Sequence, residues 1–412
     1  MRAEIISVGT EHLLGQIVDT NAPYIAKKLA SLGIDVFRKT TVGDNQKRIA
    51  EVLKESLKRV DLIIITGGLG PTEDDITKEV VSEVLRERLE LNKEIFTKIE
   101  ERLACFKKGT KRGALKQALI PHSAKILRNK IGTAPGILLE KEKKRIFILP
   151  GVPQEMRIMM DEEVIPYLSK ISKKECIKSH ILKLWGIGES QVEEKIADIL
   201  QNQSNPTIAL LVKKEGVCIR ITAKFPPDKI NREIKKVEHF LRIRLGDYIY
   251  GINEESMEEV VGTLLKKKRL SVSVAESCTG GLLSHLFTNI SGSSTYYQGG
   301  IVSYSNEVKS SLLKVPDKLI KEKGAVSPQV AKEMAKRVRE ICGSDIGIGI
   351  TGIAGPTGGT PQKPVGLVYI AISTPKEEIS QKFLFSGKRE NIKWKASQTA
   401  LDLLRKQLIK KN

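Results

Sequence analysis

The stretch "VDLIIITGG" (60–68) constrains the fold most, because a run of isoleucines is followed there by two glycines. Successive side chains of a strand point to opposite faces, so such a run is fully buried only when both faces of a sheet are covered. Strands of this kind alternate with helical stretches such as "NAPYIAKKLASLG" (21–33). The alternation predicts a parallel, doubly wound sheet, which binds ligands beyond the carboxyl ends of its strands.

A chain of 412 residues is long enough for about three domains. The doubly wound α/β domain is expected to cover residues 1–170. Residues 171–252 predict a small α+β linker domain that contains a hairpin at "KEG" (214–216) and no cluster of catalytic side chains. Residues 253–412 alternate strands and helices again and predict a second α/β domain.

The net charge of +20 suggests either anionic small-molecule ligands or nucleic acid. Aromatic residues make up only 5% of the chain, which leaves few platforms for stacked bases. The stretch "WGIGES" (185–190) also lacks the GxxG loop that a nucleic-acid module of this size usually carries. We therefore expect most of the charge to lie on a solvated surface, and we do not expect nucleic-acid binding.

The location of the protein follows from what its sequence lacks. No run of about 20 apolar residues is present, so we expect no membrane-spanning helix. The first residues read as a strand and not as a signal peptide. The five cysteines form no CxxC pair, which favours reduced thiols over disulfides or a zinc site. We expect a cytoplasmic protein that forms a homodimer.

The loop "TGGLGPTEDD" (66–75) follows the first buried strand and is the first candidate site. Its glycines allow the backbone to approach a phosphate; they are Gly67, Gly68 and Gly70. Thr72 is placed to cap the following helix, whose N-terminus would then face the ligand. The loop is not a P-loop, because the Lys-Ser/Thr ending is absent.

Acidic side chains gather at the same predicted sheet edge. Asp74 and Asp75 are expected in the first helical turn, and Asp44 follows the preceding strand. Carboxylates beside a phosphate are the ligands that a hydrated Mg²⁺ needs. The alternatives are favourable interaction with the helix dipole for Asp74 and Asp75, and a turn or capping role for Asp44. Together these residues favour a metal–phosphate site.

Three motifs in the first segment resemble the molybdopterin-binding fold, and most closely its CinA branch. They are "SVGTEHLLGQIVDTNA" (7–22), "TGGLGPTEDD" (66–75) and "LPGVPQEM" (149–156). The resemblance implies a nucleotide-type ligand, a divalent metal such as Mg²⁺, and pyrophosphatase activity on ADP-ribose.

By matching position, the resemblance assigns Asp44 and Asp74 or Asp75 to the metal and the phosphates. It places Glu11 and Glu155 in the same pocket, with Glu155 as a further metal ligand; the alternative for Glu155 is a helix N-terminal charge. The chain departs from the family pattern at His12, where leucine is usual.

The stretch "VAESCTGG" (274–281) is the second candidate site, with a hydroxyl and a thiol between a strand and a helix. Ser277 is one candidate nucleophile and Cys278 is its rival, while a simple helix cap is the non-catalytic alternative. Only His285 lies near in the sequence, two helical turns on, and it would point away. A Ser-His-Asp triad is therefore not expected, which leaves lysine as the activator.

"IVSYSNEVKSSLL" (301–313) supplies that lysine. Tyr304 ends the predicted strand, and Lys309 follows just over one helical turn later, so both are expected near Ser277. Thr351 ends the next buried strand in "TGIAGPTGG" (351–359), whose glycine amides are candidate donors to an anion or an oxyanion.

Four motifs in series resemble the C-terminal domain of CinA proteins, the nicotinamide-nucleotide amidase family. They are "AESCTGG", "YSNEVK", "TGIAGPTGG" and "GKRENI". The resemblance implies hydrolysis of nicotinamide mononucleotide to nicotinate mononucleotide and ammonia without a metal. It makes Ser277 the nucleophile, has Tyr304 and Lys309 activate it, has Thr351 assist, and gives the substrate phosphate to Arg389, which otherwise reads as a solvated helix-terminal cation.

Further residues are expected to contact substrate. In the C-terminal segment they are Thr279, Gly280, Gly281, Asn306, Gly352 and Gly355; in the N-terminal segment they are Gly67, Gly68, Gly70, Thr72 and Glu11. The full chain is thus identified as a member of the CinA family with two hydrolytic sites. The alternatives are a molybdopterin-binding protein and an accessory protein of DNA uptake or recombination.

Overall fold

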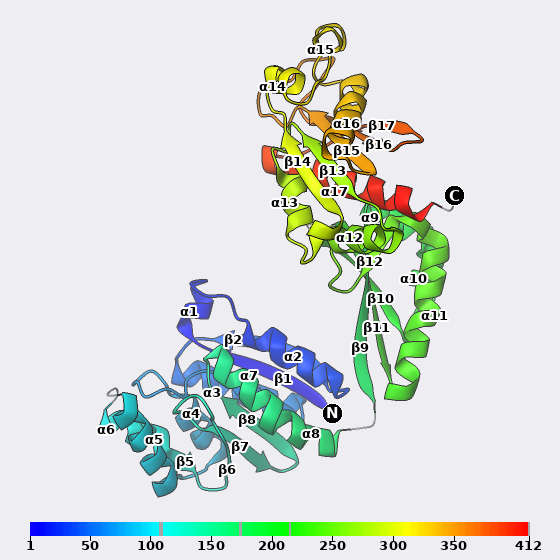
Figure 1. Cartoon of the computed structure of the whole chain (residues 1–412). Coiled ribbons are helices and arrows are strands. Elements are labelled where there is room, and N and C mark those ends of the chain that lie inside the picture. The colour runs from blue at the N-terminus through cyan, green and yellow to red at the C-terminus, as the bar shows by residue number, and fades with distance from the viewer. Residues whose placement is uncertain (107–109, 173–174, 214–215, 411–412) are drawn as a thin grey trace. The chain divides into compact units, whose positions relative to one another are not determined.

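The structure is a computed structural model that describes residues 1–106, 110–172, 175–213 and 216–410, the side chains of 103–106 excepted (Figure 1). The chain divides into two compact units. One comprises Met1–Ser179 with Thr222–Lys235, and the other comprises His180–Ile221 with Lys236–Asn412. In the described residues, no helix is both long enough and apolar enough to cross a membrane.

The first domain is built on a six-stranded sheet with the order β2-β1-β3-β8-β7-β6. Its strands are β1 (Arg2–Val8), β2 (Asp35–Val42), β3 (Leu62–Thr66), β6 (Lys125–Leu127), β7 (Gly136–Lys141) and β8 (Lys144–Leu149); β4 (Leu89–Leu91) and β5 (Leu119–Pro121) pair separately. Its helices are α1 (Thr10–Leu13), α2 (Asn21–Ser31), α3 (Gln46–Arg59), α4 (Thr77–Leu85), α5 (Lys93–Phe106), α6 (Lys111–Ala118), α7 (Pro153–Met159) and α8 (Ile165–Ile171), with a π-helical turn at Met160–Val164.

Both faces of this sheet are buried, as the apolar run in β3 predicts. Leu62 and Ile64 pack into one core with residues of α2 and α7, and Ile63 and Ile65 pack into another with residues of α3 and α4. Figure 1 shows these helices on the two sides of the sheet. The period-two alternation along β3 therefore divides its side chains between two hydrophobic cores.

The expectation of a parallel sheet is only partly correct. β1 pairs in parallel with β2 and β3, and β3 pairs in parallel with β8, but β7 is antiparallel to both β8 and β6. Only Glu142 and Lys143 separate β7 from β8, and both have positive φ values, 48° and 70°. A two-residue connection closes a hairpin, whereas a parallel crossover needs a dozen residues or more.

The loop after β3 also differs from the expectation. α4 begins at Thr77, so Asp74 and Asp75 lie in the loop and not in the first helical turn. Thr72 caps no helix, because the residue before α4 is Ile76 and no side chain caps this end. The loop folds back on the strand instead: the Thr77 hydroxyl donates to the carbonyl of Gly67 at 2.9 Å.

The middle domain is a four-stranded sheet with the order β10-β11-β9-β12. Its elements are β9 (Cys176–Leu184), α9 (Glu189–Lys195), α10 (Ala197–Gln201), β10 (Thr207–Lys213), β11 (Gly216–Phe225), α11 (Pro227–Leu245) and β12 (Ile249–Ile252), with a 3₁₀ turn at Gly246–Tyr248. β10 and β11 are neighbours, as the predicted hairpin requires, while residues 214 and 215 of its turn lie outside the described residues.

The third domain is built on a five-stranded sheet with the order β14-β13-β15-β16-β17. Its strands are β13 (Val272–Glu276), β14 (Tyr297–Val302), β15 (Ile346–Gly352), β16 (Leu367–Ser373) and β17 (Glu378–Leu384). Its helices are α12 (Met257–Lys268), α13 (Leu282–Thr288), α14 (Asn306–Ser311), α15 (Asp317–Lys323), α16 (Pro328–Cys342) and α17 (Arg389–Ile409), with a 3₁₀ turn at Ser293–Thr295. β13, β14 and β15 are parallel, and β16 and β17 extend the sheet in antiparallel pairs.

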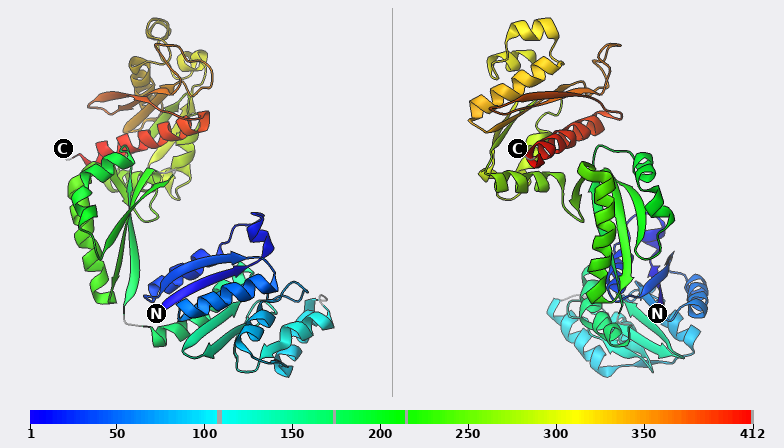
Figure 2. Two further views of the ribbon diagram at one scale, coloured as in Figure 1. Left: turned by 180° about the vertical axis from the view of Figure 1, so that it is seen from behind. Right: turned by 90° about the vertical axis from the view of Figure 1, so that its right-hand side faces the viewer.

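Helices cover both faces of this sheet, with α17 on one side and α16 on the other (Figure 2). The isoleucines of β15 pack with α17 residues, whereas Gly347 and Gly349 face α16. A Cβ atom at Gly347 would lie 2.0 Å from the Ala335 carbonyl oxygen, and one at Gly349 would lie 2.3 Å from that of Ala331. The two glycines therefore allow α16 to pack directly on the backbone of the strand.

Candidate active sites

Ser277 lies at the carboxyl end of β13, at the start of a tight turn into α13. Its backbone N–H donates to the carbonyl of Ile350 in β15 at 3.0 Å, which fixes the start of the turn. Gly280 and Gly281 complete the turn with φ values of 60° and 93°, a region that glycine enters without strain. The strand–turn–helix arrangement predicted for this stretch is confirmed.

The side chain of Lys309, from α14, reaches the Ser277 hydroxyl. Its Nζ lies 3.0 Å from Ser277 Oγ and also donates to the carbonyls of Ser303 at 2.8 Å and Tyr304 at 3.2 Å. Lys309 is only 2% exposed. Burial lowers the pKa of its amine to about 8, so roughly a tenth of the amines is neutral at pH 7, far more than for an exposed lysine. A neutral amine beside a serine hydroxyl is a general base.

The rival nucleophile, Cys278, is poorly suited to the role. Burial raises the pKa of its thiol to about 12, with a further contribution from the charge of Glu276. A thiol with such a pKa carries almost no thiolate near neutral pH. His285 is not a base for either residue, since its ring contacts Asn289 within its own helix at 3.2 Å.

A cavity of about 320 Å³ opens beside Ser277. Of the residues predicted for this site, those that line it are Ser277, Tyr304, Asn306, Lys309, Thr351, Gly352, Gly355 and Arg389. Thr279, Gly280 and Gly281 are not among its lining residues. Thr279 is fully buried, and its hydroxyl has no hydrogen-bond partner in the described part of the chain.

The hydroxyl groups of Tyr304 and Thr351, to which the family resemblance assigns roles at Ser277, both form hydrogen bonds with other residues. The Tyr304 hydroxyl accepts a hydrogen bond from Arg389 Nη2 at 2.9 Å, and only its carbonyl contacts Lys309. The Thr351 hydroxyl donates to the carbonyl of Ala325 at 2.8 Å. Arg389 also donates to the carbonyl of Gly355 at 2.7 Å. Lys309 is thus the one predicted activator that contacts the Ser277 hydroxyl.

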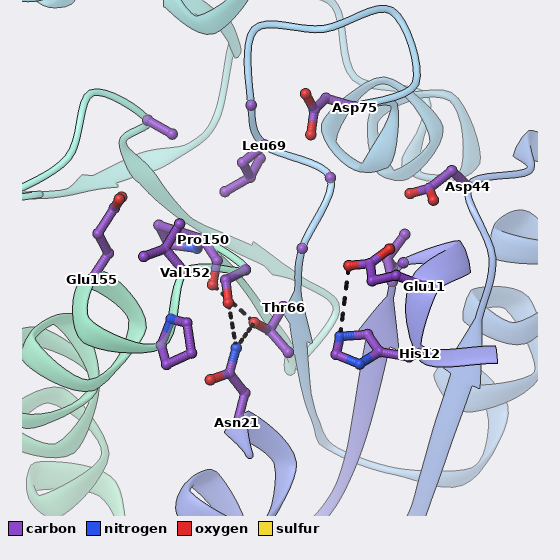
Figure 3. Close-up of a pocket in the computed structure, with 18 of the residues that line it drawn as sticks. Glu11, His12, Asn21, Asp44, Thr66, Leu69, Asp75, Pro150, Val152 and Glu155 are labelled. Atoms are coloured by element: carbon purple, nitrogen blue, oxygen red, sulfur yellow. Dashed lines mark hydrogen bonds and ion pairs between the residues drawn. The ribbon is translucent and has the colours of Figure 1, made fainter. Parts of the chain in front are cut away.

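A second cavity, of about 560 Å³, lies beyond the carboxyl ends of β1 and β3 (Figure 3). The predicted residues that line it are Glu11, Asp44, Gly67, Gly68, Gly70, Asp74, Asp75 and Glu155, whereas Thr72 is not among them. Gly67 has a φ of 103°, and a Cβ atom there would lie 2.1 Å from the carbonyl oxygen of Val8. Only glycine fits at this position, so the backbone itself forms the floor of the cavity.

Three of the carboxylates in this cavity accept hydrogen bonds from nearby donors. Asp44 Oδ2 accepts hydrogen bonds from the N–H and the hydroxyl of Thr10 at 2.8 and 2.9 Å. Asp75 Oδ2 accepts the N–H of Thr72 at 2.9 Å. Across the cavity (Figure 3), Glu155 accepts a hydrogen bond from Asn129 at 2.7 Å. The Thr72 side chain and, to a lesser degree, the charge of Lys116 lower the pKa of the neighbouring Asp74.

These carboxylates provide the oxygen ligands that a hard divalent cation prefers. In the described residues, however, no three acidic, histidine or cysteine side chains come together as a complete metal site. A metal therefore fits this cavity only if phosphate oxygens and water complete its coordination, as is common for Mg²⁺.

Sequence reasoning did not identify Asn21 and Thr66 as lining residues of this cavity. Asn21 Nδ2 donates to the carbonyl of Gly151 at 2.7 Å and to Thr66 Oγ1 at 3.2 Å (Figure 3). Asn21 Oδ1 and His12 Nδ1 are buried without a partner in the described chain. The only sequence signal was the position of Asn21 within "DTNA" (19–22), where an asparagine at a helix start is normally explained as a cap.

Comparison with known proteins assigns all three segments. Residues 4–170 match the family model described as "Probable molybdopterin binding domain", residues 179–251 match the "Damage-inducible protein CinA KH domain", and residues 254–408 match the "CinA C-terminal domain". The middle segment, predicted from sequence as a linker, is thus similar to a KH domain, although it has no GxxG in "WGIGES" (185–190).

Full-length relatives show the same order of domains. The chain is 48% identical over 410 residues to a competence-damage inducible protein of Caldicellulosiruptor bescii. The matched region covers 99% of this chain and 100% of that protein. It is 49% identical over 414 residues to the protein of that name from Thermoanaerobacter pseudethanolicus, with 99% of each covered. The crystal structure of CinA from Thermoplasma acidophilum is 34% identical and covers 40% of this chain and 97% of its own, with a TM-score of 0.37.

The first and third domains each have a polar cavity beyond the carboxyl ends of parallel strands, which is the edge where open α/β sheets bind their ligands. The chain belongs to the CinA family of competence-damage inducible proteins.

Proposed function

We propose that this protein is a bifunctional hydrolase of pyridine-nucleotide recycling. Its C-terminal domain hydrolyses nicotinamide mononucleotide to nicotinate mononucleotide and ammonia. Its N-terminal domain hydrolyses ADP-ribose to AMP and ribose 5-phosphate with a divalent metal. The observation that carries the first activity is the buried contact of 3.0 Å between Ser277 Oγ and Lys309 Nζ.

The chemistry of the amidase follows from this pair. The neutral Lys309 amine takes the proton of Ser277 as Oγ attacks the carboxamide carbon of the substrate. Ammonia leaves with that proton, and an ester between the nicotinoyl group and Ser277 remains. A water molecule, deprotonated by Lys309, then cleaves the ester and releases the acid. Backbone N–H groups of the glycine-rich loop 352–359 are the candidate donors to the oxyanion.

Arg389 is the candidate ligand for the substrate phosphate. Its guanidinium binds only a carbonyl and a phenol hydroxyl, and no carboxylate pairs with it in the part of the chain that the structure describes. A guanidinium that no anion neutralises at the edge of a cavity favours a phosphate, which it binds through two parallel hydrogen bonds. Nicotinamide mononucleotide carries such a group at the end opposite to its amide.

The N-terminal cavity supports the second activity through its glycine floor and its carboxylates. Backbone at Gly67, Gly68 and Gly70 allows a close approach of a pyrophosphate. Asp44 and Asp74 or Asp75 would hold the metal together with phosphate oxygens. When bound, a divalent metal neutralises charge that develops on the phosphates during hydrolysis.

Two other functions keep a specific observation in their favour. The match of residues 4–170 to a molybdopterin-binding domain favours a pterin ligand for the first cavity. The match of residues 179–251 to a KH domain, together with the charge of +20, favours a nucleic-acid role. Neither function accounts for the Ser277–Lys309 pair. Binding to a DNA column that weakens steeply as salt is added would support the nucleic-acid role.

The decisive experiment measures two products from one preparation. Ammonia release is assayed with nicotinamide mononucleotide, and AMP with ribose 5-phosphate is detected after incubation with ADP-ribose and Mg²⁺. We expect both. Absence of ammonia from a folded protein, with nicotinamide mononucleotide recovered intact, would reject the amidase assignment, and intact ADP-ribose would reject the second activity independently.

A further inference from the structure

Glu276, the residue before the nucleophile, has a fully buried side chain that does not line the cavity. Its backbone ties the end of β13 to the next strand, because the Glu276 carbonyl accepts the N–H of Ser303 at 2.8 Å. The N–H of Ser277 is bound on the other side, to Ile350. The first residues of the nucleophile turn are thus fixed to both neighbouring strands.

The Glu276 carboxyl group holds the far end of the same turn. Oε2 accepts the N–H groups of Gly281 and Leu283, both at 3.0 Å. Oε1 accepts the N–H of Ser284 at 2.8 Å and its hydroxyl at 2.6 Å. Four donors and no acceptor surround the group, which is the set that an ionised carboxylate satisfies.

This contact replaces the usual helix cap. The first N–H groups of a helix have no partner within it, and the N-cap residue of α13, Gly281, has no side chain to supply one. Glu276 supplies it from five residues earlier. Residues 277–281 therefore form a loop whose two ends are joined by one side chain, although it contains two glycines in left-handed conformations.

We propose that Glu276 is a positioning residue that holds Ser277 Oγ within reach of Lys309 Nζ. The proposal rests on the amidase function proposed above. Rate depends on alignment: a misplacement of about 1 Å can cost about 100-fold. Without the carboxylate the turn is free to shift about its glycines, while Arg389 and the rest of the cavity, which binds the substrate, stay in place.

The test compares Glu276→Gln with a matched loss of a helix cap elsewhere in the same unit. In glutamine an NH₂ group replaces one of the two carboxylate oxygens, and each of these oxygens accepts two hydrogen bonds. At least two of the four hydrogen bonds are therefore lost. The controls are Ser256→Ala and Glu259→Ala, which remove the capping box of α12. For each variant, kcat and KM for ammonia release, Tm, and amide hydrogen exchange of a peptide covering 277–285 are measured in the full chain.

We expect Glu276→Gln to lower kcat by about 100-fold with KM changed less than about threefold, and to speed exchange over 277–285. The controls should lower Tm while leaving kcat and that exchange unchanged. Ser284→Ala, which loses one bond of the four, should lower kcat less, by about three- to tenfold, and Ser284→Thr should restore it.

A Glu276→Gln protein with kcat per folded molecule close to that of the wild type overturns the proposal. If this variant does not fold, an unchanged kcat in Ser284→Ala overturns it instead. If the wild type releases no ammonia, the proposed function fails, and hydrogen exchange then decides: equal exchange over 277–285 in wild type and Glu276→Gln shows that the carboxylate does not hold the turn.

Discussion

Ser277 and Lys309 come from different elements, the end of β13 and the fourth position of α14, and meet in a buried setting. Burial lowers the pKa of Lys309, because a desolvated amine loses its proton more readily than an exposed one. Cys278, beside Ser277, is affected in the opposite direction, since burial favours its neutral thiol. Burial thus favours the neutral form of both side chains, which is the basic form of the Lys309 amine and the unreactive form of the Cys278 thiol.

Replacing Ser277 with alanine should lower ammonia release by about 10³-fold or more, because the covalent route is lost. Cys278→Ala should change it little, since that thiol is protonated. Steady-state assays with nicotinamide mononucleotide measure both, and thermal melts check that the variants are folded. An inactive Cys278→Ala beside an active Ser277→Ala would replace the serine mechanism with a thiol mechanism.

The pH profile should report Lys309. Because only the neutral amine accepts a proton, kcat/KM should rise with pH and level off above about 8, the value to which burial lowers the Lys309 pKa. Below that point it should fall about tenfold per pH unit. Lys309→Arg, whose guanidinium keeps its proton, should be nearly inactive throughout. A flat profile between about pH 6.5 and about pH 9.5 would exclude Lys309 as the base.

Asp44→Asn or Asp74→Asn should lower ADP-ribose hydrolysis by about 100-fold, because each keeps its shape but loses the charge that holds a metal. Glu73→Gln is the matched control: Glu73 lies in the same loop but pairs with Arg112 at the surface, outside the cavity. Turnover of ADP-ribose with added Mg²⁺ measures all three. Equal rates in the two aspartate variants and the control would leave the aspartates with a structural role alone.

Sequence reasoning succeeds where a motif fixes both residue type and position on a sheet edge. Ser277 and the glycines of residues 66–70 lie at strand ends, and Lys309 lies in the helix that follows β14, so the cavity that each of them lines was predictable. Side chains that act through the backbone were not. Glu276 reads as one more polar residue at a strand end, because its hydrogen bonds to residues 281–284 depend on the shape of the turn.

At the scale of elements, the same contrast holds for the sheets. The strands with alternating helices were placed correctly, but the antiparallel edges of both α/β sheets were not predicted as such. Direction depends on the connection: β7 and β8 are joined by two residues, and β16 and β17 are joined by a similarly short link. Apolar patterning indicates which strands are buried and does not by itself give their direction.

The contact between β15 and α16 predicts a large effect from one methyl group. Gly347→Ala should lower stability by about 1–3 kcal/mol, because its Cβ would overlap the backbone of α16. Gly343→Ala, at a left-handed position with open space around it, should cost only about 1 kcal/mol from backbone strain. Chemical denaturation compares the two, and an equal cost would mean that α16 shifts to accept the methyl group.

At the scale of the whole molecule, two polar cavities with different side chains lie in separate compact units. The cavity around Asp44 belongs to the first, and the cavity around Ser277 belongs to the second. Each cavity is bordered by its own hydrophobic cores and not by a shared one. The two proposed activities should therefore respond to different treatments.

Removal of divalent metal by a chelator should distinguish the two proposed activities. EDTA should abolish ADP-ribose hydrolysis, because the mechanism proposed for the first cavity uses a divalent metal. It should leave ammonia release intact, because the mechanism proposed for Ser277 and Lys309 uses none. Excess Mg²⁺ should restore the lost activity. Both products are followed in the same treated sample, and loss of ammonia release along with ADP-ribose hydrolysis would contradict the independence of the two sites.

The glycines of β15 carry a consequence for how this chain can diverge. Gly347 and Gly349 line neither of the two cavities and lie on the face of the sheet toward α16, so the packing of that helix restricts them. Ser277 and Lys309 line a cavity, and the proposed reaction restricts them in addition to packing. In a relative that has lost the reaction, we expect Ser277 and Lys309 to be replaced first. Gly347 and Gly349 should be retained, because the packing of α16 on β15 still requires them.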